Sequence, residues 1–145
     1  MRFLLDVMLG TLATYLRMCG HDTAYALDRG VEDDDAVLAL ARAEGRRLLT
    51  RDAGLAARAA GSIRIEATEI EGQLRELREA GVELSLDRPE RCSRCNDRLE
   101  RVEDGGTPDY APDPEGEDIW RCTACGQHYW KGSHWEDVRD RLESA

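Results

Sequence analysis

The sequence has 145 residues, 41% of them hydrophobic, and a formal net charge of −10 at pH 7. This length allows one ordinary domain, or a small domain followed by a mini-domain. No apolar run approaches the roughly 20 residues that a membrane-spanning helix needs. The N-terminus also lacks the basic and then apolar regions of a secretion signal. We therefore expect a cytoplasmic protein without a membrane segment.

The basic residues are unusual, because Lys131 is the only lysine among the 20 lysines and arginines. An acidic, nearly lysine-free surface predicts a halophilic protein, in which high salt screens the self-repulsion. A GC-rich codon bias, which also favours arginine over lysine, is the alternative explanation. The acidity does not exclude a nucleic-acid partner, because non-specific attraction to phosphate is weak for any protein at molar salt.

The first 86 residues alternate between short apolar runs and helical patterns. Strands are predicted at residues 3–6, 23–26, 48–49 and 62–66. The intervening helices begin near residues 9, 33, 53 and 68, and they end at Gly20, Gly45, Gly61 and Gly81. Strands that alternate with short helices specify a parallel sheet with right-handed crossovers, so the expected fold class is α/β. Residues 82–86 are a candidate for a fifth, short edge strand.

The composition changes after residues 87–91, which form a polar linker. All three tryptophans and two of the four tyrosines lie in the final 54 residues, and residues 105–117 are rich in glycine, proline and acid. We therefore predict two domains, an α/β domain at 1–86 and a smaller one at 92–145 that ends in a helix at 135–142. The second segment has few aliphatic residues and needs a staple in order to fold.

Four of the five cysteines form two C-x-x-C pairs, Cys92 with Cys95 and Cys122 with Cys125. Without a secretion signal, this pattern indicates a metal site rather than disulfides. Four thiolates form the closed tetrahedral ligand set of structural zinc. Two redox-active dithiols are the alternative, but neither pair opens a helix of the α/β part. Cys19, on the apolar face of a predicted helix, is interpreted as a small buried hydrophobic residue.

An aromatic segment, YWKGSHW at residues 129–135, follows the second cysteine pair. Exposed aromatic side chains beside a basic residue can stack on nucleic-acid bases. The same rings can instead form the core of the small domain or its seam with the first domain. We favour the structural interpretation of this segment.

Acidic residues follow two of the predicted strands and open one helix. Asp6 and Asp52 come at the ends of apolar runs, and residues 33–35 are three consecutive aspartates at a helix start. The carboxyl ends of parallel strands and the starts of the following helices lie at one edge of a sheet. We therefore expect these carboxylates to meet there. Taken singly, residues 33–35 and Asp52 are also plain helix caps.

Clustered carboxylates repel one another, and a bound divalent cation relieves that cost. Such a site activates water for attack on a phosphodiester. Among the three consecutive aspartates we expect Asp34 to point inward, with Asp33 as the cap and Asp35 as the second choice. Glu66, at the end of the Ile63–Ile65 strand, is a possible fourth ligand. Two neighbouring arginines, Arg47 and Arg51, are candidates for holding phosphate, although solvated arginines are the default.

Taken together, these motifs resemble a known family. RFLLDVMLGTLATYLRMCGHD, DDDAVLALARAEGRRLLTRD, RCSRCN and WRCTACGQHYWKGSHW occur in that order and span nearly the whole chain. They resemble the PIN-like ribonuclease family named after the C-terminal domain of the Mut-seven exonuclease. The resemblance implies a PIN-like three-layer α/β domain followed by a zinc ribbon. It also implies RNA cleavage dependent on Mg²⁺ or Mn²⁺ at Asp6, Asp34 and Asp52, with zinc on the four cysteines.

The leading hypothesis is therefore a metal-dependent ribonuclease that holds single-stranded RNA along the sheet edge and the ribbon. A phosphoacceptor regulatory domain would need an acid pair after the first strand and a lysine after the fifth. The chain has only Asp6 at the first place and no lysine before Lys131. A non-catalytic RNA-binding adaptor, with a degenerate α/β domain and a binding ribbon, is the remaining alternative.

Overall fold

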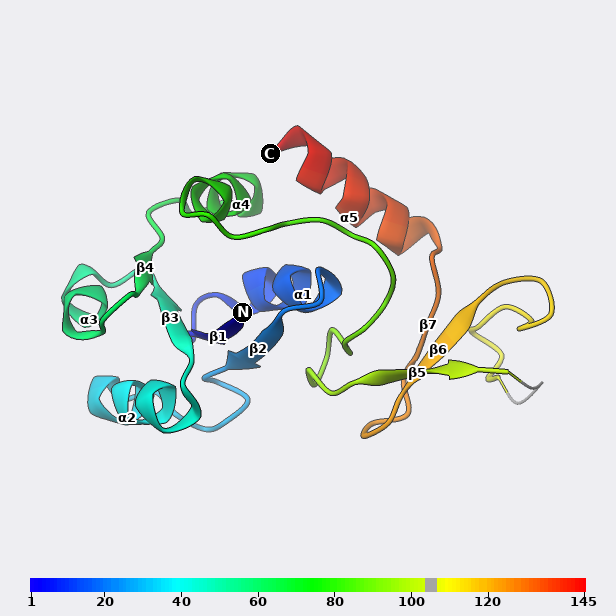
Figure 1. The fold of residues 1–145 in the computed structure, drawn as a ribbon, viewed down its shortest axis with the longest axis horizontal. Coiled ribbons are helices and arrows are strands. Elements are labelled where there is room, and N and C mark those ends of the chain that lie inside the picture. The colour runs from blue at the N-terminus through cyan, green and yellow to red at the C-terminus, as the bar shows by residue number, and fades with distance from the viewer. Residues whose placement is uncertain (104–106) are drawn as a thin grey trace.

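The computed structural model describes residues 1–103 and 107–145 (Figure 1). Its first part holds one parallel sheet with strand order β2-β1-β3-β4. The strands are β1 (Arg2–Leu5), β2 (Asp22–Tyr25), β3 (Arg47–Thr50) and β4 (Ile63–Arg64). The connecting helices are α1 (Gly10–Met18), α2 (Asp34–Glu44) and α3 (Ala53–Arg58), and α4 (Ile70–Glu79) follows β4. The parallel α/β sheet predicted from the alternating pattern is confirmed.

Both faces of this sheet are buried, which explains why its strands are continuous apolar runs rather than alternating ones. Phe3 and Leu5 of β1 lie in one core cluster, with residues of α1 and α4. Leu4 points to the opposite face and packs with residues of α2 and α3. The sheet is therefore the middle of three layers, with α1 and α4 on one side and α2 and α3 on the other (Figure 1).

Residues 82–86 do not form the fifth strand. No strand is assigned to them, although Val82 and Leu84 are buried in the cluster that contains α1 and α4. The apolar alternation of this segment therefore reflects packing on the helical layer rather than pairing with a sheet edge.

The second part of the chain forms a three-stranded antiparallel sheet in the order β5-β6-β7. Its strands are β5 (Leu99–Val102), β6 (Ile119–Cys122) and β7 (His128–Tyr129), and the helix α5 (Ser133–Ser144) follows. We call residues 91–129 the ribbon. Trp135 and Leu142 of α5 are buried in the same cluster as α1 and α4. Within the part of the chain described, no helix is long and apolar enough to cross a membrane.

The ribbon docks on the outer edge of β2 through polar contacts that are buried or part-buried. Asn96, which has a left-handed backbone with φ of 72°, accepts from the backbone N–H of Thr23 at 2.8 Å and donates to the Asp22 carboxylate at 2.7 Å. Arg17, only 4% exposed, donates to the Thr23 carbonyl at 2.9 Å. Its guanidinium also reaches the carbonyl of Ser93 at 3.1 Å. The edge strand is thereby covered rather than left open to pairing with another chain.

Candidate functional site

The carboxyl edge of the parallel sheet brings three polar side chains together from neighbouring strands. Tyr25 ends β2, Asp6 follows β1, and Thr50 ends β3. The Tyr25 hydroxyl donates to the Val7 carbonyl at 2.5 Å, beside Asp6 in the chain. Burial, followed by the charges of Asp28 and Asp6, raises the pKa of Tyr25. This phenol therefore stays protonated near the acids and acts as a hydrogen-bond donor.

Gly10 makes room for that tyrosine. A Cβ at this position would lie 3.1 Å from the Tyr25 hydroxyl oxygen and 3.2 Å from the adjoining ring carbon. Both distances are tighter than ordinary van der Waals contact. A glycine at the start of α1 therefore lets the Tyr25 ring close over the residues that follow β1.

Thr50 connects the two strand-end acids through its hydroxyl group. The hydroxyl donates to Asp6 Oδ2 at 2.7 Å and accepts from the backbone N–H of Asp52 at 3.1 Å. The second oxygen, Asp6 Oδ1, accepts from the backbone N–H of Val7 at 2.9 Å. Thr50 is fully buried, whereas Asp6 is half-buried and Asp52 is exposed. These bonds fix the orientation of the Asp6 carboxylate at the edge, where part of the Asp6 side chain is accessible to solvent.

Asp52 also caps α3, as the simpler interpretation of this residue predicted. Its Oδ1 accepts from the backbone N–H of Leu55 at 3.1 Å, which satisfies one of the unpaired donors at the helix start. A carboxylate has two oxygens and several lone pairs. The cap therefore uses one side of Asp52 and is compatible with a second role for the other oxygen.

The three consecutive aspartates lie on the exposed start of α2. Asp33 is the N-cap residue by its backbone but makes no capping hydrogen bond with its side chain. Asp35 forms an ion pair with Arg58 at the end of α3. The hydrogen bond from Arg58 to Asp35, and then the charges of Asp35, Asp34 and Asp33, raise the pKa of Arg58. Of the three acids, Asp35 contacts Arg58, and the charges of Asp33 and Asp34 act on it from a greater distance.

Only the four cysteines form a close metal-ligating group in the part of the chain that the structure describes. The structure joins Asp6 and Asp52 through Thr50, but it does not bring Asp34 within ligand-sharing distance of both. The Glu66 side chain is exposed and lies 3.5 Å from Arg64, and its backbone N–H donates to Glu76 at 3.1 Å.

The two candidate arginines lie at different ends of β3. Arg47 begins the strand and donates to the Gly61 carbonyl, at the edge away from the acids. Arg51 stands between Thr50 and Asp52, directly at the carboxyl edge. Its Nε is buried and has no hydrogen-bond partner among the described residues. Of the two, Arg51 is the one placed beside the strand-end carboxylates.

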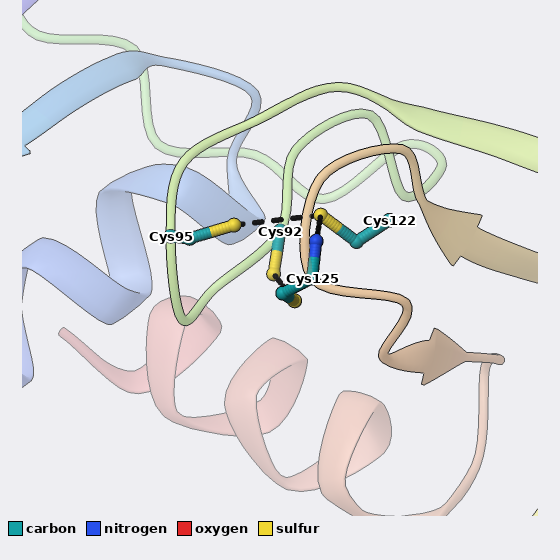
Figure 2. A group of neighbouring side chains, drawn as sticks. All are labelled: Cys92, Cys95, Cys122 and Cys125. Atoms are coloured by element: carbon teal, nitrogen blue, oxygen red, sulfur yellow. Dashed lines mark hydrogen bonds between the residues drawn. The ribbon is translucent and has the colours of Figure 1, made fainter.

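The four paired cysteines converge in the ribbon, as Figure 2 shows. Their sulfur atoms all lie within 4.8 Å of one another. Cys92 Sγ is 3.7 Å from Cys125 Sγ, and Cys95 Sγ is 3.4 Å from Cys122 Sγ. A tetrahedral site with metal–sulfur bonds of about 2.3 Å has sulfur–sulfur edges of roughly 3.8 Å. The donor set and its spacing therefore fit a structural metal such as zinc.

The surroundings of the cysteines also suit a metal-bound thiolate. The backbone N–H groups of Ala124 and Cys125 point to Cys122 Sγ at 3.4 Å, and the Tyr129 hydroxyl lies 2.9 Å from Cys92 Sγ. Cys19 is separate from this group and packs against the core of the first part. Burial raises the pKa of Cys19 to about 12, which keeps its thiol protonated and unreactive.

Sequence reasoning missed Thr50 and Tyr25, although both had a signal. Thr50 is the one polar residue at the end of an otherwise buried strand, and Tyr25 ends the neighbouring strand. A hydroxyl group at a strand end, beside an expected acid, is a positioning candidate. Only the strand order shows which acid such a hydroxyl group contacts.

This fold and site define a class of protein: a parallel α/β domain with carboxylates at its carboxyl edge and an appended four-cysteine ribbon. The family model described as the Mut7-C RNAse domain matches residues 1–142, and the chain belongs to this family. The resemblance seen in the sequence motifs is thereby confirmed, and the family description indicates a ribonuclease-like role. No curated protein and no solved structure matches the chain.

Proposed function

We propose that the chain is a metal-dependent ribonuclease that hydrolyses RNA phosphodiester bonds at the carboxyl edge of its parallel sheet. The observation that supports this most directly is the Thr50 bridge between Asp6 and the Asp52 backbone. It holds one carboxylate in a fixed orientation beside a second one, at the edge where parallel sheets bind their ligands.

Asp6 and Asp52 fit Mg²⁺ or Mn²⁺, because both cations prefer carboxylate oxygens together with water and phosphate oxygens. Asp34 is the proposed third ligand. It lies in the first turn of α2, which begins on the same side of the sheet, and its exposed side chain has freedom to turn. Bound at this edge, the cation supplies a water of lowered pKa and a counter-charge for the attacked phosphate.

The residues around the acids would hold the substrate. Arg51, half-buried at the carboxyl edge, is proposed to bind a phosphate through its guanidinium group. We give Arg47 a lesser part, because its guanidinium is already bonded to Gly61. The Tyr25 hydroxyl already donates to the Val7 carbonyl, so we give Tyr25 a positioning role, holding the backbone beside Asp6. Zinc on the four cysteines has a structural role, since four thiolates leave no open position for chemistry.

The test is cleavage of labelled single-stranded and structured RNAs with Mg²⁺, with Mn²⁺ or with EDTA, at low and high KCl. The native chain is compared with Asp6→Asn/Asp52→Asn. Glu79→Gln, an exposed acid at the far end of α4, is the matched control. We expect metal-dependent cleavage that the double substitution abolishes and the control retains, at unchanged zinc content.

A non-catalytic adaptor is the second candidate, and one observation favours it. In this structure Asp34 does not form a close ligand group with Asp6 and Asp52. If RNA binds but no metal or salt condition yields cleavage, and Asp6→Asn/Asp52→Asn binds as the native chain does, then the adaptor replaces the nuclease. Loss of RNA binding only upon replacement of the cysteines would support the same conclusion.

A further inference from the structure

A cavity of about 250 Å³ lies where the ribbon meets the first part of the chain. Its walls are aromatic, formed by Tyr129, Trp130 and Trp135. Polar groups of Arg91, His128 and His134 complete the lining. The volume is just below the roughly 300–1,000 Å³ of sites for drug-sized ligands. It therefore suits one planar ring system better than a longer molecule.

The lining of this cavity contains no aspartate or glutamate. That is unusual in a chain with 30 acidic residues, and residues 119–135 as a whole contain none. Three other cavities of the described residues are each lined by two or three carboxylates: Glu100 and Glu103; Glu83, Asp87 and Glu90; and Glu71, Asp137 and Asp140. The walls of the aromatic cavity thus present no carboxylate to a polyanion.

Basic and aromatic groups meet at the same place. Lys131, the only lysine of the chain, has its Nζ 5.6 Å from the centre of the Trp135 ring. Trp130 is half-buried, and its ring lies 6.2 Å from that of Tyr110 at an interplanar angle of 30°. Trp130 therefore keeps part of its aromatic surface accessible. The cation, Lys131, is two residues before Ser133, which lines the cavity.

We propose that this cavity binds one unstacked base of single-stranded RNA, with Trp130 as the stacking platform and Lys131 beside the adjoining phosphate. The inference rests on the proposed function in taking RNA as the ligand, and it names a subsite of that substrate. Proteins bind single strands by stacking bases on aromatic side chains and by drawing the backbone to cations. An acid-free aromatic cavity beside a lysine supplies both.

The cavity lies at the opposite edge of the parallel sheet from the acids. Met18, the last residue of α1, lines it, and Arg91 of its wall lies 3.9 Å from Asp22 at the start of β2. Asp6 precedes the other end of α1, whose nine residues span about 13 Å. At the roughly 3.4 Å per nucleotide of a stacked strand, that distance corresponds to about four nucleotides. The base subsite therefore anchors the RNA several nucleotides from the bond that is cut.

The test measures binding of a fluorescein-labelled ten-nucleotide single-stranded RNA by anisotropy, in the zinc-loaded Asp6→Asn/Asp52→Asn chain, which does not cut the probe. Trp130→Ala is compared with Trp130→Phe and with Trp120→Ala. Trp120 is a half-buried tryptophan of the ribbon that does not line the cavity. We expect Trp130→Ala to weaken binding about tenfold, Trp130→Phe to retain most of the affinity, and Trp120→Ala to change it less than twofold.

Removing bases from the RNA tests the same stacking interaction without altering the protein. A ten-nucleotide RNA with abasic residues should bind the parent chain about tenfold more weakly than the intact RNA, and Trp130→Ala should add no further loss. Equal binding of the abasic and intact RNAs would overturn the proposal, even if Trp130→Ala fails to fold. Equal binding by a folded Trp130→Ala chain would do the same and would leave a protein partner as the occupant of the cavity.

Failure of this inference is distinguishable from failure of the nuclease. Suppose that the native chain cleaves RNA and that Trp130→Ala cleaves RNAs of two, five and ten nucleotides at the same rate. This result overturns the subsite and leaves the nuclease in place. Loss of affinity in Trp130→Ala without cleavage by the native chain supports the subsite and overturns the nuclease. If both hold, Trp130→Ala should slow cleavage of the ten-nucleotide RNA about tenfold at low substrate concentration and leave the dinucleotide unaffected.

Discussion

Replacing Thr50 by valine isolates the hydroxyl group that connects the two strand-end acids. Valine has nearly the same shape, so the fully buried site stays filled and no cavity forms. The substitution removes the 2.7 Å hydrogen bond to the charged Asp6 carboxylate and leaves the Asp52 backbone N–H without its acceptor. A hydrogen bond to a charged group contributes about 1.5–3 kcal/mol, and the part-buried Asp52 N–H left without a partner adds to the cost.

We therefore expect Thr50→Val to lower the free energy of unfolding by about 2–3 kcal/mol. Urea unfolding of the zinc-loaded chain measures this loss, and with typical denaturant slopes it moves the midpoint by about 1–2 M. The matched control is Thr23→Val. Thr23 is also a fully buried threonine of a parallel strand, but its hydroxyl donates to the neutral His21 carbonyl at 3.1 Å. Its loss should cost only about 1 kcal/mol.

Cleavage supplies the second measurement on the same two variants. If Thr50 positions Asp6 for a metal, Thr50→Val should reduce the cleavage rate about tenfold or more and raise the Mg²⁺ concentration needed for half-maximal rate. Thr23→Val should alter neither quantity. Equal destabilisation by the two substitutions would refute the charge-assisted bond. A fully active, normally Mg²⁺-dependent Thr50→Val chain would show that the bridge has no part in catalysis.

Two further predictions concern metal removal and acid. Chelation of the metal at the four cysteines should remove hydrogen-exchange protection from the amides of β5, β6 and β7 while β1 and β3 keep theirs, because the ribbon has little core of its own. Equal loss in both sheets would show that they unfold as one unit. Burial raises the pKa of Asp22, but hydrogen bonds from Asn96 and Arg46 outweigh it and lower the pKa from 3.8 to about 2. The stability from this carboxylate, about 2 kcal/mol, is therefore complete above about pH 4 and is lost as the pH falls towards 2. Asp22→Asn should flatten this acid limb of the unfolding titration, and an unchanged limb would contradict the assignment.

The parallel sheet was predictable because the local and global signals agree. The runs at β1 and β3 are apolar at every position from Phe3 to Leu5 and from Leu48 to Leu49, as strands buried on two faces must be. Glycines end the helices, and Gly45 has the left-handed φ of 62° expected of a helix C-cap. Those patterns act within a few residues of one another, and the sequence contains them directly.

Residues 82–86 show where local patterns fail. Val82 and Leu84 alternate with polar residues, and both are buried. That alternation describes which side of an extended segment faces the core. It does not say whether a strand edge is available for pairing. Residues 82–86 pack on the layer of α1 and α4 instead of pairing with a strand, and the local sequence does not contain that information.

The site was predictable in part, for a related reason. Asp6 and Asp52 were placed at one edge because both follow buried strands. Thr50 is a neighbour of Asp6 only because β3 pairs with β1, and strand order is a long-range property. Asp34 depends on the direction in which a flexible, exposed side chain points. The ion pair of Asp35 with Arg58, 23 residues away, was beyond any local pattern.

Docking of the ribbon connects the four-cysteine group to the parallel sheet. Asn96, adjacent to Cys95, uses its amide to pair with β2 as a strand residue would, and Arg17 binds the carbonyls that follow Cys92. The four thiolates therefore fix the loop that these contacts require. The aromatic cavity is built from both sides of that junction, with Met18 on one side and Trp130 on the other. If the cavity binds RNA as we propose, a metal at the four cysteines would contribute to that binding without touching RNA, because it would set the position of the cavity relative to the acids.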